Sequence, residues 1–260
     1  MKNTDTRWAD DAWADILKKV KQTSAVIGSD FPAMSKDGEY ICSKRLADWT
    51  TGFWPGILWL LYNESGDQSL REIAEACEAK LDPVLEEYTD LGHDIGFVWQ
   101  LSSINNFKVS GSNESRRRAL TAASHLAGRF NINGRFLQAW NKNDVNQANP
   151  QGLSIIDSMM NLPILFFAAK ELNAPRFEHV AKAHAATVLR EFINADGSVK
   201  HMVEFCPFTG SRLRVHGGQG FSEESSWSRG ASWAIHGMAK MHSMTGDEIY
   251  LETAKKVADF

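Results

Sequence analysis

The chain has 260 residues, 43% hydrophobic and 23% charged, which is ordinary for a globular protein with room for one or two domains. A formal net charge of −4 argues against nucleic-acid binding, because neutralising phosphates requires a basic face. No apolar run is long enough to cross a bilayer, so no membrane association is expected.

The N-terminal residues up to Trp8 lack the apolar region of a signal peptide. The cysteines are odd in number and widely spaced, which predicts neither a disulfide framework nor a zinc site; they are Cys42, Cys77 and Cys206. The cysteine pattern favours a reducing compartment, and no metal or other cofactor is expected.

In chain order, the first predicted element is an amphipathic helix from Trp8 to about Ile27. Residues 28–51 read as a loop with no sustained period. Residues 52–62 follow as an apolar helix, with Pro55 in its first turn, where a missing N–H is tolerated.

A repeated signal then appears. Short Gly/Asn/Pro turns separate apolar helices from charged amphipathic ones; the turns lie at 65–67, 110–113, 172–175 and 245–247. The apolar helices are expected at 53–63, 95–108, 154–171 and 229–244. This alternation predicts an all-α fold of stacked helical hairpins, with about nine helices in one domain, 1–260. One short β-hairpin is possible near 198–214.

Long segments precede the apolar helices, at 28–52, 86–94, 131–152 and 195–228. They exceed ordinary connector lengths, which usually indicates functional loops. We therefore expect a site at the end of the helical stack where these loops converge.

Two aspartates are candidates for catalysis. Asp94 follows His93 at the start of an apolar helix, where it could instead be an N-cap. Asp157 lies in an apolar stretch, where burial would raise its pKa as a general acid requires; the alternative is a structural capping role. Asn161, one turn later, could orient Asp157.

The stretch from Ser225 to Gly237 has unusual chemistry, because Arg229 lies between Trp227 and Trp233. A guanidinium beside aromatic walls suits a planar anionic ligand such as a sugar acid. Alternatively, the tryptophans are core residues and Arg229 extends to water. Upstream, His201 and Gln219 are further candidates, although histidines and glycine-flanked turns are often purely structural.

Several motifs together resemble the unsaturated glucuronyl hydrolases of glycoside hydrolase family 88. They occur in the family's order: DWTTGFWPGILWL at 48–60, HDIGF at 93–97, LQAW at 137–140, IIDSMMNLP at 155–163, GQG at 218–220 and SWSRGASW at 226–233. The resemblance implies an α/α toroid of six helical hairpins, here incomplete and lacking the C-terminal part. It also implies a cytoplasmic bacterial enzyme that acts after polysaccharide lyases.

The implied reaction hydrates the C4=C5 vinyl ether of a 4,5-unsaturated uronic acid at the non-reducing end of a glycosaminoglycan-type oligosaccharide. By the resemblance, Asp157 is the general acid/base and Asp94 the second essential aspartate. The implied substrate-binding residues are Trp49, His93, Trp140, His201, Gln219, Trp227, Arg229 and Trp233.

The chain departs from the family pattern at Gly218, where the family has a basic or His residue before Gln219. The helix count also falls short of six hairpins. We therefore expect the 260 residues alone to expose apolar flanks on the first helix and on 229–244, to associate through them, and to hydrolyse little substrate. The alternatives are the related unsaturated rhamnogalacturonyl hydrolases and an inactive toroid that only binds sugar.

Overall fold

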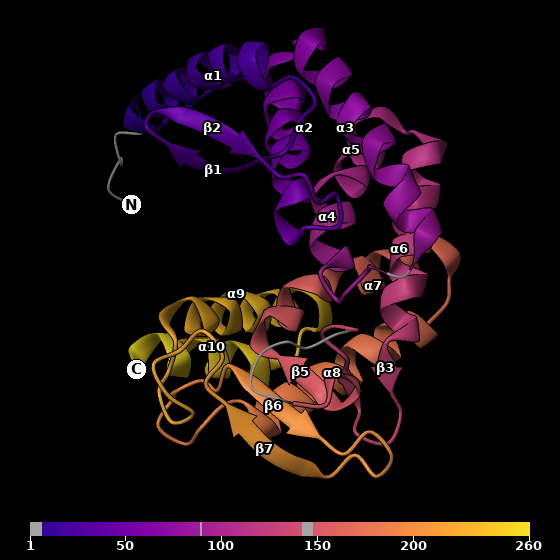
Figure 1. Ribbon diagram of the computed structural model, residues 1–260, viewed down its shortest axis with the longest axis vertical. Helices are drawn as coiled ribbons and strands as arrows, with labels where there is room; N and C mark the ends of the chain where they lie inside the picture. The colour runs from indigo at the N-terminus through magenta and orange to yellow at the C-terminus, as the bar shows by residue number, and fades with distance from the viewer. Residues whose placement is uncertain (1–6, 89, 142–147) are drawn as a thin grey trace.

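A computed structural model describes residues 7–88, 90–141 and 148–260. Its α-helices are α1 (Arg7–Ile27), α2 (Phe53–Ser65), α3 (Gln68–Glu87), α4 (Ile95–Leu101), α5 (Ser103–Ser110), α6 (Asn113–Gly128), α7 (Pro163–Leu172), α8 (Arg176–Glu191), α9 (Ser228–Thr245) and α10 (Glu248–Asp259). They follow an open arc from α1 to α10, with α3 and α6 on its outer side (Figure 1).

Within the described residues, strands are short and form three separate sheets. The hairpin β1 (Pro32–Lys36) and β2 (Glu39–Cys42) follows α1, and the two-residue strands β3 (Phe130–Asn131) and β4 (Phe136–Leu137) follow α6. A three-stranded antiparallel sheet has the order β5 (Leu153–Ile155), β6 (Met202–Phe205) and β7 (Arg212–His216). The hairpin predicted near 198–214 is confirmed, whereas the β1–β2 hairpin lies in a stretch predicted to be a loop.

The repeated hairpin signal corresponds to a shared helix ending. α2, α5, α7 and α9 each end at a residue in the left-handed conformation: Gly66 (φ 68°), Gly111 (φ 73°), Asn173 (φ 49°) and Gly246 (φ 77°). Glycine tolerates this conformation because it has no Cβ, and asparagine is the next most tolerant residue. Each ending turns the chain directly into the next amphipathic helix.

Two predicted apolar helices have different bounds in the structure. The helix expected at 95–108 is divided at Ser102, whose hydroxyl donates to the Val98 carbonyl (2.6 Å), so that α4 and α5 are separate. The helix expected at 154–171 begins as strand β5 and the 3₁₀ helix η3 (Ile156–Asn161). Short apolar runs suit either a strand or a helix, and pairing with β6 decides in favour of the strand here.

A buried carboxylate connects four helices on the N-terminal arm. Glu78 on α3 is 1% exposed and accepts hydrogen bonds from Trp59 Nε1 (3.2 Å), Ser103 Oγ (2.9 Å), Asn106 Nδ2 (2.9 Å) and Ser115 Oγ (2.8 Å). These donors lie on α2, α5 and α6. Arg118 also approaches Glu78, at 3.6 Å, while forming a two-point ion pair with Asp82.

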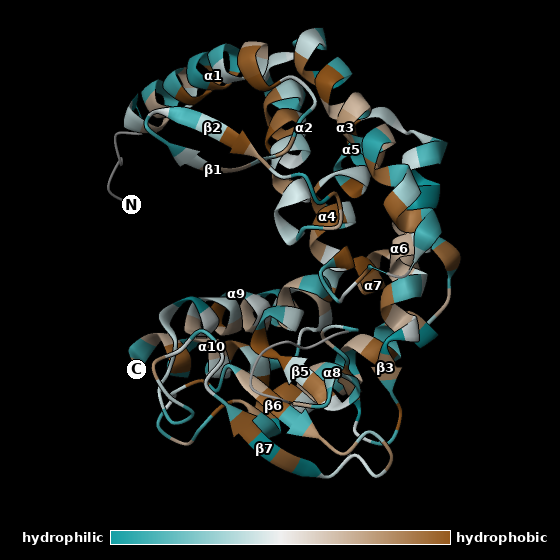
Figure 2. Ribbon diagram, viewed as in Figure 1, coloured by the Kyte–Doolittle hydropathy of each residue, from teal (hydrophilic) through white to brown (hydrophobic). Residues whose placement is uncertain are grey.

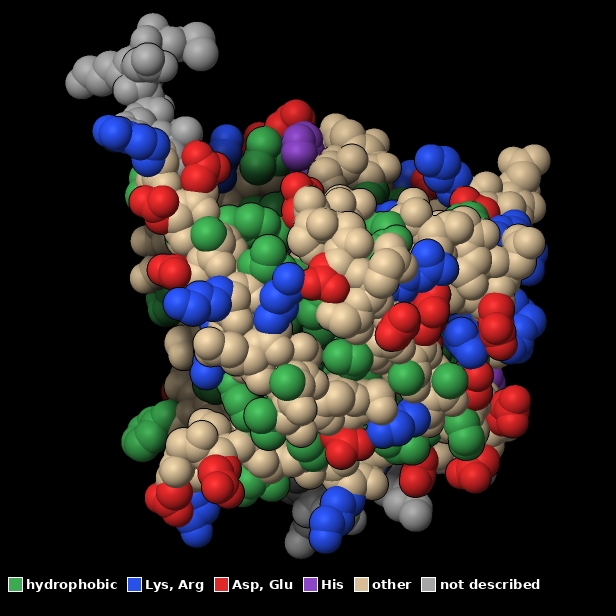
Figure 3. Space-filling model, turned by 90° about the horizontal axis from the view of Figure 1, so that it is seen from above, with side chains coloured by type: hydrophobic (Ala, Val, Ile, Leu, Met, Phe, Trp, Pro, Cys, Tyr) green, Lys and Arg blue, Asp and Glu red, His purple; other side chains and the backbone are tan. Residues whose placement is uncertain are grey.

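The expected apolar flanks are present on only one arm. Trp8 and Trp13 on α1 are 71% and 40% exposed. The expectation for α9 is wrong, because its apolar side packs against η3 and α10 and its exposed residues are mainly polar: Ser232, His236, Lys240 and Ser243. Hydrophobic colouring in Figure 2 follows the inner helices and β5–β6, and the face seen in Figure 3 intersperses hydrophobic with charged side chains. Self-association and low activity of the chain alone stay predictions.

We expect Glu78→Ala to destabilise the fold by about 3–5 kcal/mol, because it removes the shared acceptor of four buried donors on α2, α5 and α6. Denaturant unfolding measures this change. Glu75→Ala is the matched control on the same helix, since the Arg71–Glu75 pair is partly exposed and worth roughly 1 kcal/mol or less. Equal effects of the two substitutions would contradict a structural role for the Glu78 network.

Candidate active site

Asp94 occupies the N-cap position of α4, yet its side chain makes no capping hydrogen bond. The N-cap alternative therefore does not account for the carboxylate. Asp94 Oδ1 lies 3.4 Å from His93 Nε2. Burial raises the pKa of Asp94, and the nearby negative charges of Asp157 and Asp48 add to this, while His93 opposes it.

Asn161 determines how His93 faces Asp94. Asn161 Oδ1 accepts a hydrogen bond from the Phe97 N–H (2.7 Å), so the Nδ2 amide hydrogens point toward His93 Nδ1 at 3.3 Å. His93 Nδ1 is then an acceptor, and the neutral ring carries its proton on Nε2, facing Asp94. Burial lowers the pKa of His93, which favours this neutral ring. Asn161 thus holds the segment that carries Asp94, rather than contacting Asp157 as the sequence interpretation suggested.

Asp157 lies on η3 beside a second histidine. Its Oδ2 is buried, accepts no hydrogen bond from the described residues, and lies 3.6 Å from His201 Nε2. His201 Nδ1 lies 3.1 Å from the Gln219 N–H, which donates to it, and 3.2 Å from the Gly217 carbonyl, so two backbone groups hold the ring with Nε2 directed toward Asp157. The two aspartates are therefore each faced by one histidine.

Gly218 explains how His201 fits. Gly218 has a φ of +58°, and a Cβ there would overlap the His201 ring and the Met202 sulfur. The basic or His residue that the family pattern has at this position is therefore excluded by the local backbone of this chain. His216 does not replace it, because its Nε2 bonds Glu204 (2.8 Å) on the neighbouring strand.

Arg229 lies in the first turn of α9, between two indoles. Its guanidinium carbon is 4.3 Å from the centroid of the Trp227 ring and 5.8 Å from that of Trp49. Arg229 also donates to Gln219 Oε1. The ring of Trp233 contacts Phe97 (ring centroids 5.6 Å apart). The result is an exposed cation held by aromatic faces, an arrangement suited to an anion.

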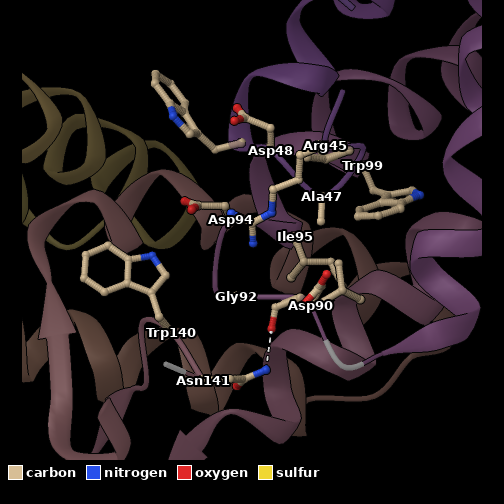
Figure 4. Close-up of a pocket in the computed structure, with 13 residues that line it drawn as sticks. Arg45, Ala47, Asp48, Asp90, Gly92, Asp94, Ile95, Trp99, Trp140 and Asn141 are labelled. Carbon is tan, nitrogen blue, oxygen red and sulfur yellow. Dashed lines mark hydrogen bonds between the residues drawn. The ribbon is translucent and has the colours of Figure 1, made fainter. Parts of the chain in front are cut away.

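A cavity of about 410 Å³ adjoins this group of residues. Of the predicted site residues, Trp49, Asp94 and Trp140 line it, and Figure 4 labels Asp94 and Trp140. Asp157, His201 and Arg229 are not among its lining residues. Trp49 connects the two regions, because it lines the cavity and also faces Arg229. The predicted residues therefore converge at the loop end of the helices.

Sequence reasoning missed several supporting residues. Arg129 donates to the carbonyls of Leu91 (3.0 Å), Gln138 (2.9 Å) and Ala139 (3.2 Å), joining the two loops that carry Asp94 and Trp140. Burial lowers its pKa to about 10. Arg45 lines the cavity as well. Neither residue belongs to a recognisable motif, so only their contacts in space reveal them.

Ser158 and His184 form a buried pair directly behind Asp157. His184 Nδ1 accepts from the Leu137 N–H (3.0 Å), so Nε2–H donates to Ser158 Oγ (2.6 Å), which in turn donates to the Ile155 carbonyl (2.6 Å). Because His184 Nε2 is a donor here, it cannot deprotonate the serine, and the pair is structural. It holds the turn that positions Asp157.

The chain was compared with family models, with curated proteins and with solved structures. No family model matches the chain. The chain is 36% identical to the unsaturated glucuronyl hydrolase of Bacillus sp. (strain GL1) over 95% of this chain and 65% of that protein. It is 34% identical to the unsaturated chondroitin disaccharide hydrolase of Streptococcus pyogenes serotype M1, over 85% of this chain and 55% of that protein.

A crystal structure of the Bacillus sp. GL1 unsaturated glucuronyl hydrolase superimposes with a TM-score of 0.88 at 34% identity. This superposition covers 95% of the chain and 65% of that structure. Over most of its length the chain is similar in sequence and fold to unsaturated glucuronyl hydrolases. The predicted α/α toroid of helical hairpins is thereby confirmed as the fold class, and the chain spans less than two thirds of the length of these relatives.

Two further findings concern the described residues only. They include no group of three or more His, Cys, Asp or Glu side chains arranged to hold a metal ion. None of the helices described here is long and apolar enough to cross a membrane.

His184 predicts a pH dependence of stability. Burial lowers its pKa to about 3, below the value of about 6.5 in an unfolded chain. Between these values the unfolded state binds more protons, so the free energy of unfolding should fall as pH falls, by roughly 1.4 kcal/mol per pH unit from this group.

Denaturant unfolding of the protein and of His184→Asn from pH 7 to pH 4 measures this slope. His179→Asn, at an exposed position on the same helix, is the matched control and should keep the parental slope. An unchanged slope in His184→Asn would assign the acid sensitivity to other groups.

Proposed function

We propose that this protein is a hydrolase of glycoside hydrolase family 88. It would release 4,5-unsaturated uronic acid from the non-reducing end of oligosaccharides that polysaccharide lyases produce. The observation that carries the proposal is the Asp157 carboxylate, whose buried Oδ2 lies 3.6 Å from His201 beside the Arg229–Trp227 pair. The Asp157 carboxyl group thus lies next to the Arg229 cation and the Trp227 ring, and together these groups suit an unsaturated sugar acid.

The proposed chemistry begins with proton transfer from Asp157 to C4 of the vinyl ether, which places positive charge on C5 and the ring oxygen. Water then adds to C5, and the Asp157 carboxylate accepts the proton that the water loses. The resulting hemiketal opens, and the hemiacetal formed at C1 collapses to release the second sugar. One water molecule is consumed, and Asp157 ends in its starting state.

The neighbouring groups have complementary roles in this proposal. Burial raises the pKa of Asp94. Asp94 can therefore keep its proton after Asp157 has given up its own, which limits the repulsion between the two carboxyl groups. Arg229 would bind the uronate carboxylate, and His93, His201 and Gln219 would contact ring oxygens or water. Trp49, Trp140, Trp227 and Trp233 would form the walls around the sugar.

The proposed substrates are unsaturated disaccharides of the glycosaminoglycan type, consistent with the names of the relatives. We further assign residues 1–260 to one toroid domain and the protein to a bacterial cytoplasm, supported by three free cysteines. Loss of the ultraviolet absorbance of the unsaturated uronate tests the activity. Binding without loss of absorbance would favour a sugar-binding toroid, and preference for rhamnogalacturonan products would favour the related family.

Asp157→Asn should lower turnover by at least about 100-fold, because the amide keeps the shape but cannot donate the proton. The absorbance assay measures this in protein with measurable turnover, and calorimetry with the disaccharide checks that binding persists. Near-parental turnover would move the donor role to Asp94, whose own Asn variant serves as the comparison.

Arg229→Lys should weaken binding of the unsaturated uronate, because lysine keeps the charge but loses the planar fork and the aromatic stacking. The matched ligand is the uncharged amide of the same unsaturated sugar. If the substitution reduces kcat/KM equally for acid and amide, Arg229 has a structural role and the carboxylate binds elsewhere.

A further inference from the structure

The Glu204 carboxylate connects the two sides of the β5–β6–β7 sheet (Figure 1). It lies on the central strand β6, where its Oε1 accepts a hydrogen bond from the Asn149 N–H (3.0 Å) and its Oε2 lies 2.8 Å from His216 Nε2. Asn149 caps the 3₁₀ turn η2 (Pro150–Gly152), which leads through β5 to Asp157. His216 ends β7 and precedes Gln219. Glu204 therefore ties together two segments that lead into the proposed site.

The Glu204–His216 contact lies largely out of water. The side chain of His216 is 2% exposed and that of Glu204 is 14% exposed. Because an ionised carboxylate only accepts hydrogen bonds, the His216 ring carries a hydrogen on Nε2 and donates it to Glu204. His216 Nδ1 is buried and has no hydrogen-bond partner within the part of the chain that the structure describes. The orientation of the His216 ring therefore depends on Glu204, and a buried hydrogen bond to a charged group is costly to break.

The arginine opposite Glu204 does not compete for its carboxylate. Arg214 is the cross-strand partner of Glu204 in the β6–β7 register, yet its Nε donates to Glu223 (3.1 Å). Arg214 and Glu223 are both exposed, whereas Glu204 and His216 are buried more deeply. The Glu204 carboxylate is therefore left to bind the histidine from which the Gln219 segment begins.

Two glycines separate His216 from Gln219, so the conformation of this segment depends on how its ends are held. Glycine loses more conformational freedom on folding than any other residue, and Gly218 has a φ of +58°. The Gln219 N–H and the Gly217 carbonyl lie 3.1 and 3.2 Å from His201 Nδ1. Where His216 places the start of the segment therefore determines where these two backbone groups meet His201.

We propose that Glu204 is a positioning residue of the active site, which holds the Gly217–Gln219 segment against His201 through the His216 ring. The inference rests on the proposed function, in which Asp157 is the acid that His201 faces. His201 Nε2 lies 3.6 Å from Asp157 Oδ2, so a rotation of the ring would change what this carboxylate faces. Glu204 acts through His216 and the glycine segment, and not by contact with the reacting atoms.

Paired substitutions separate this role from general stability. Glu204→Ala removes the acceptor, and His216→Leu removes the donor but keeps a side chain of similar size. His216→Gln is the conservative variant, because the amide nitrogen of glutamine can donate in place of Nε2. Glu191→Gln is the matched control. The Glu191 carboxylate is 16% exposed and lies 3.4 Å from Arg212, at the opposite end of β7 from His216.

Histidine NMR of the ligand-free protein reports on the His201 ring without a substrate. The His201 resonance is assigned by its absence in His201→Asn, and a cooperative denaturant transition shows that each variant is folded. The resonance should move in Glu204→Ala and His216→Leu, because the backbone groups at Nδ1 are displaced. It should return toward the parental position in His216→Gln and stay there in Glu191→Gln.

Turnover of an unsaturated chondroitin disaccharide is the second measurement. The kcat should fall about 10-fold in Glu204→Ala and in His216→Leu, since small displacements around a catalytic acid reduce its rate. It should recover in His216→Gln, which restores the donor, and remain parental in Glu191→Gln.

An unchanged His201 resonance in Glu204→Ala would overturn the inference. Equal displacement of the resonance in Glu191→Gln would do the same, because it would indicate a general loss of packing around β7. If Glu204→Ala does not fold, the comparison of His216→Leu with His216→Gln decides by the same criteria. If the resonance follows the Glu204–His216 contact but the parent hydrolyses no unsaturated uronate, the proposed function fails while the positioning of His201 stands.

Discussion

The site depends on a single amide side chain, Asn161. Its carbonyl oxygen accepts from Phe97 and its nitrogen donates to His93, so one residue at the end of η3 holds the segment that carries Asp94. Asp157 lies on the same 3₁₀ helix, four residues earlier. Gly96 makes the contact possible, because a Cβ at that position would overlap the Asn161 side chain. The relative position of the two aspartates is therefore set by one buried contact between segments far apart in the sequence.

Each aspartate is also faced by a histidine whose orientation its surroundings fix. Asn161 holds His93 at Nδ1, the backbone of Gly217 and Gln219 holds His201 at Nδ1, and both rings direct Nε2 toward a carboxylate. Burial raises the pKa of Asp94, the member of this pair that lines the cavity. Arg129 donates to the Leu91 and Ala139 carbonyls and so connects the loops that carry Asp94 and Trp140.

Local chemistry in the sequence was sufficient for much of the architecture. Gly66, Gly111, Asn173 and Gly246 mark the hairpin turns because few residues tolerate a positive φ. Trp227 and Arg229 were recognisable as a pair because they are two residues apart. Trp49 as the second wall was not predictable from spacing, since it lies far from Arg229 in the sequence. The 3₁₀ geometry around Asp157 was also missed, because it results from pairing of β5 with β6 and from the buried Ser158–His184 contact.

The left-handed endings of α2, α5, α7 and α9 constrain the loop lengths at one set of helix ends, whereas the loops at the other helix ends are longer and can change in length. At the tight end, each helix reverses within two or three residues, so an inserted residue would disturb the packing of the whole hairpin. At the opposite end, segments such as 28–52 and 195–228 already contain hairpins and irregular turns that can change length without moving a helix. A lineage that acquires a new oligosaccharide preference would accordingly keep the helical frame and accumulate its differences in the segments that carry Arg45 and Gln219.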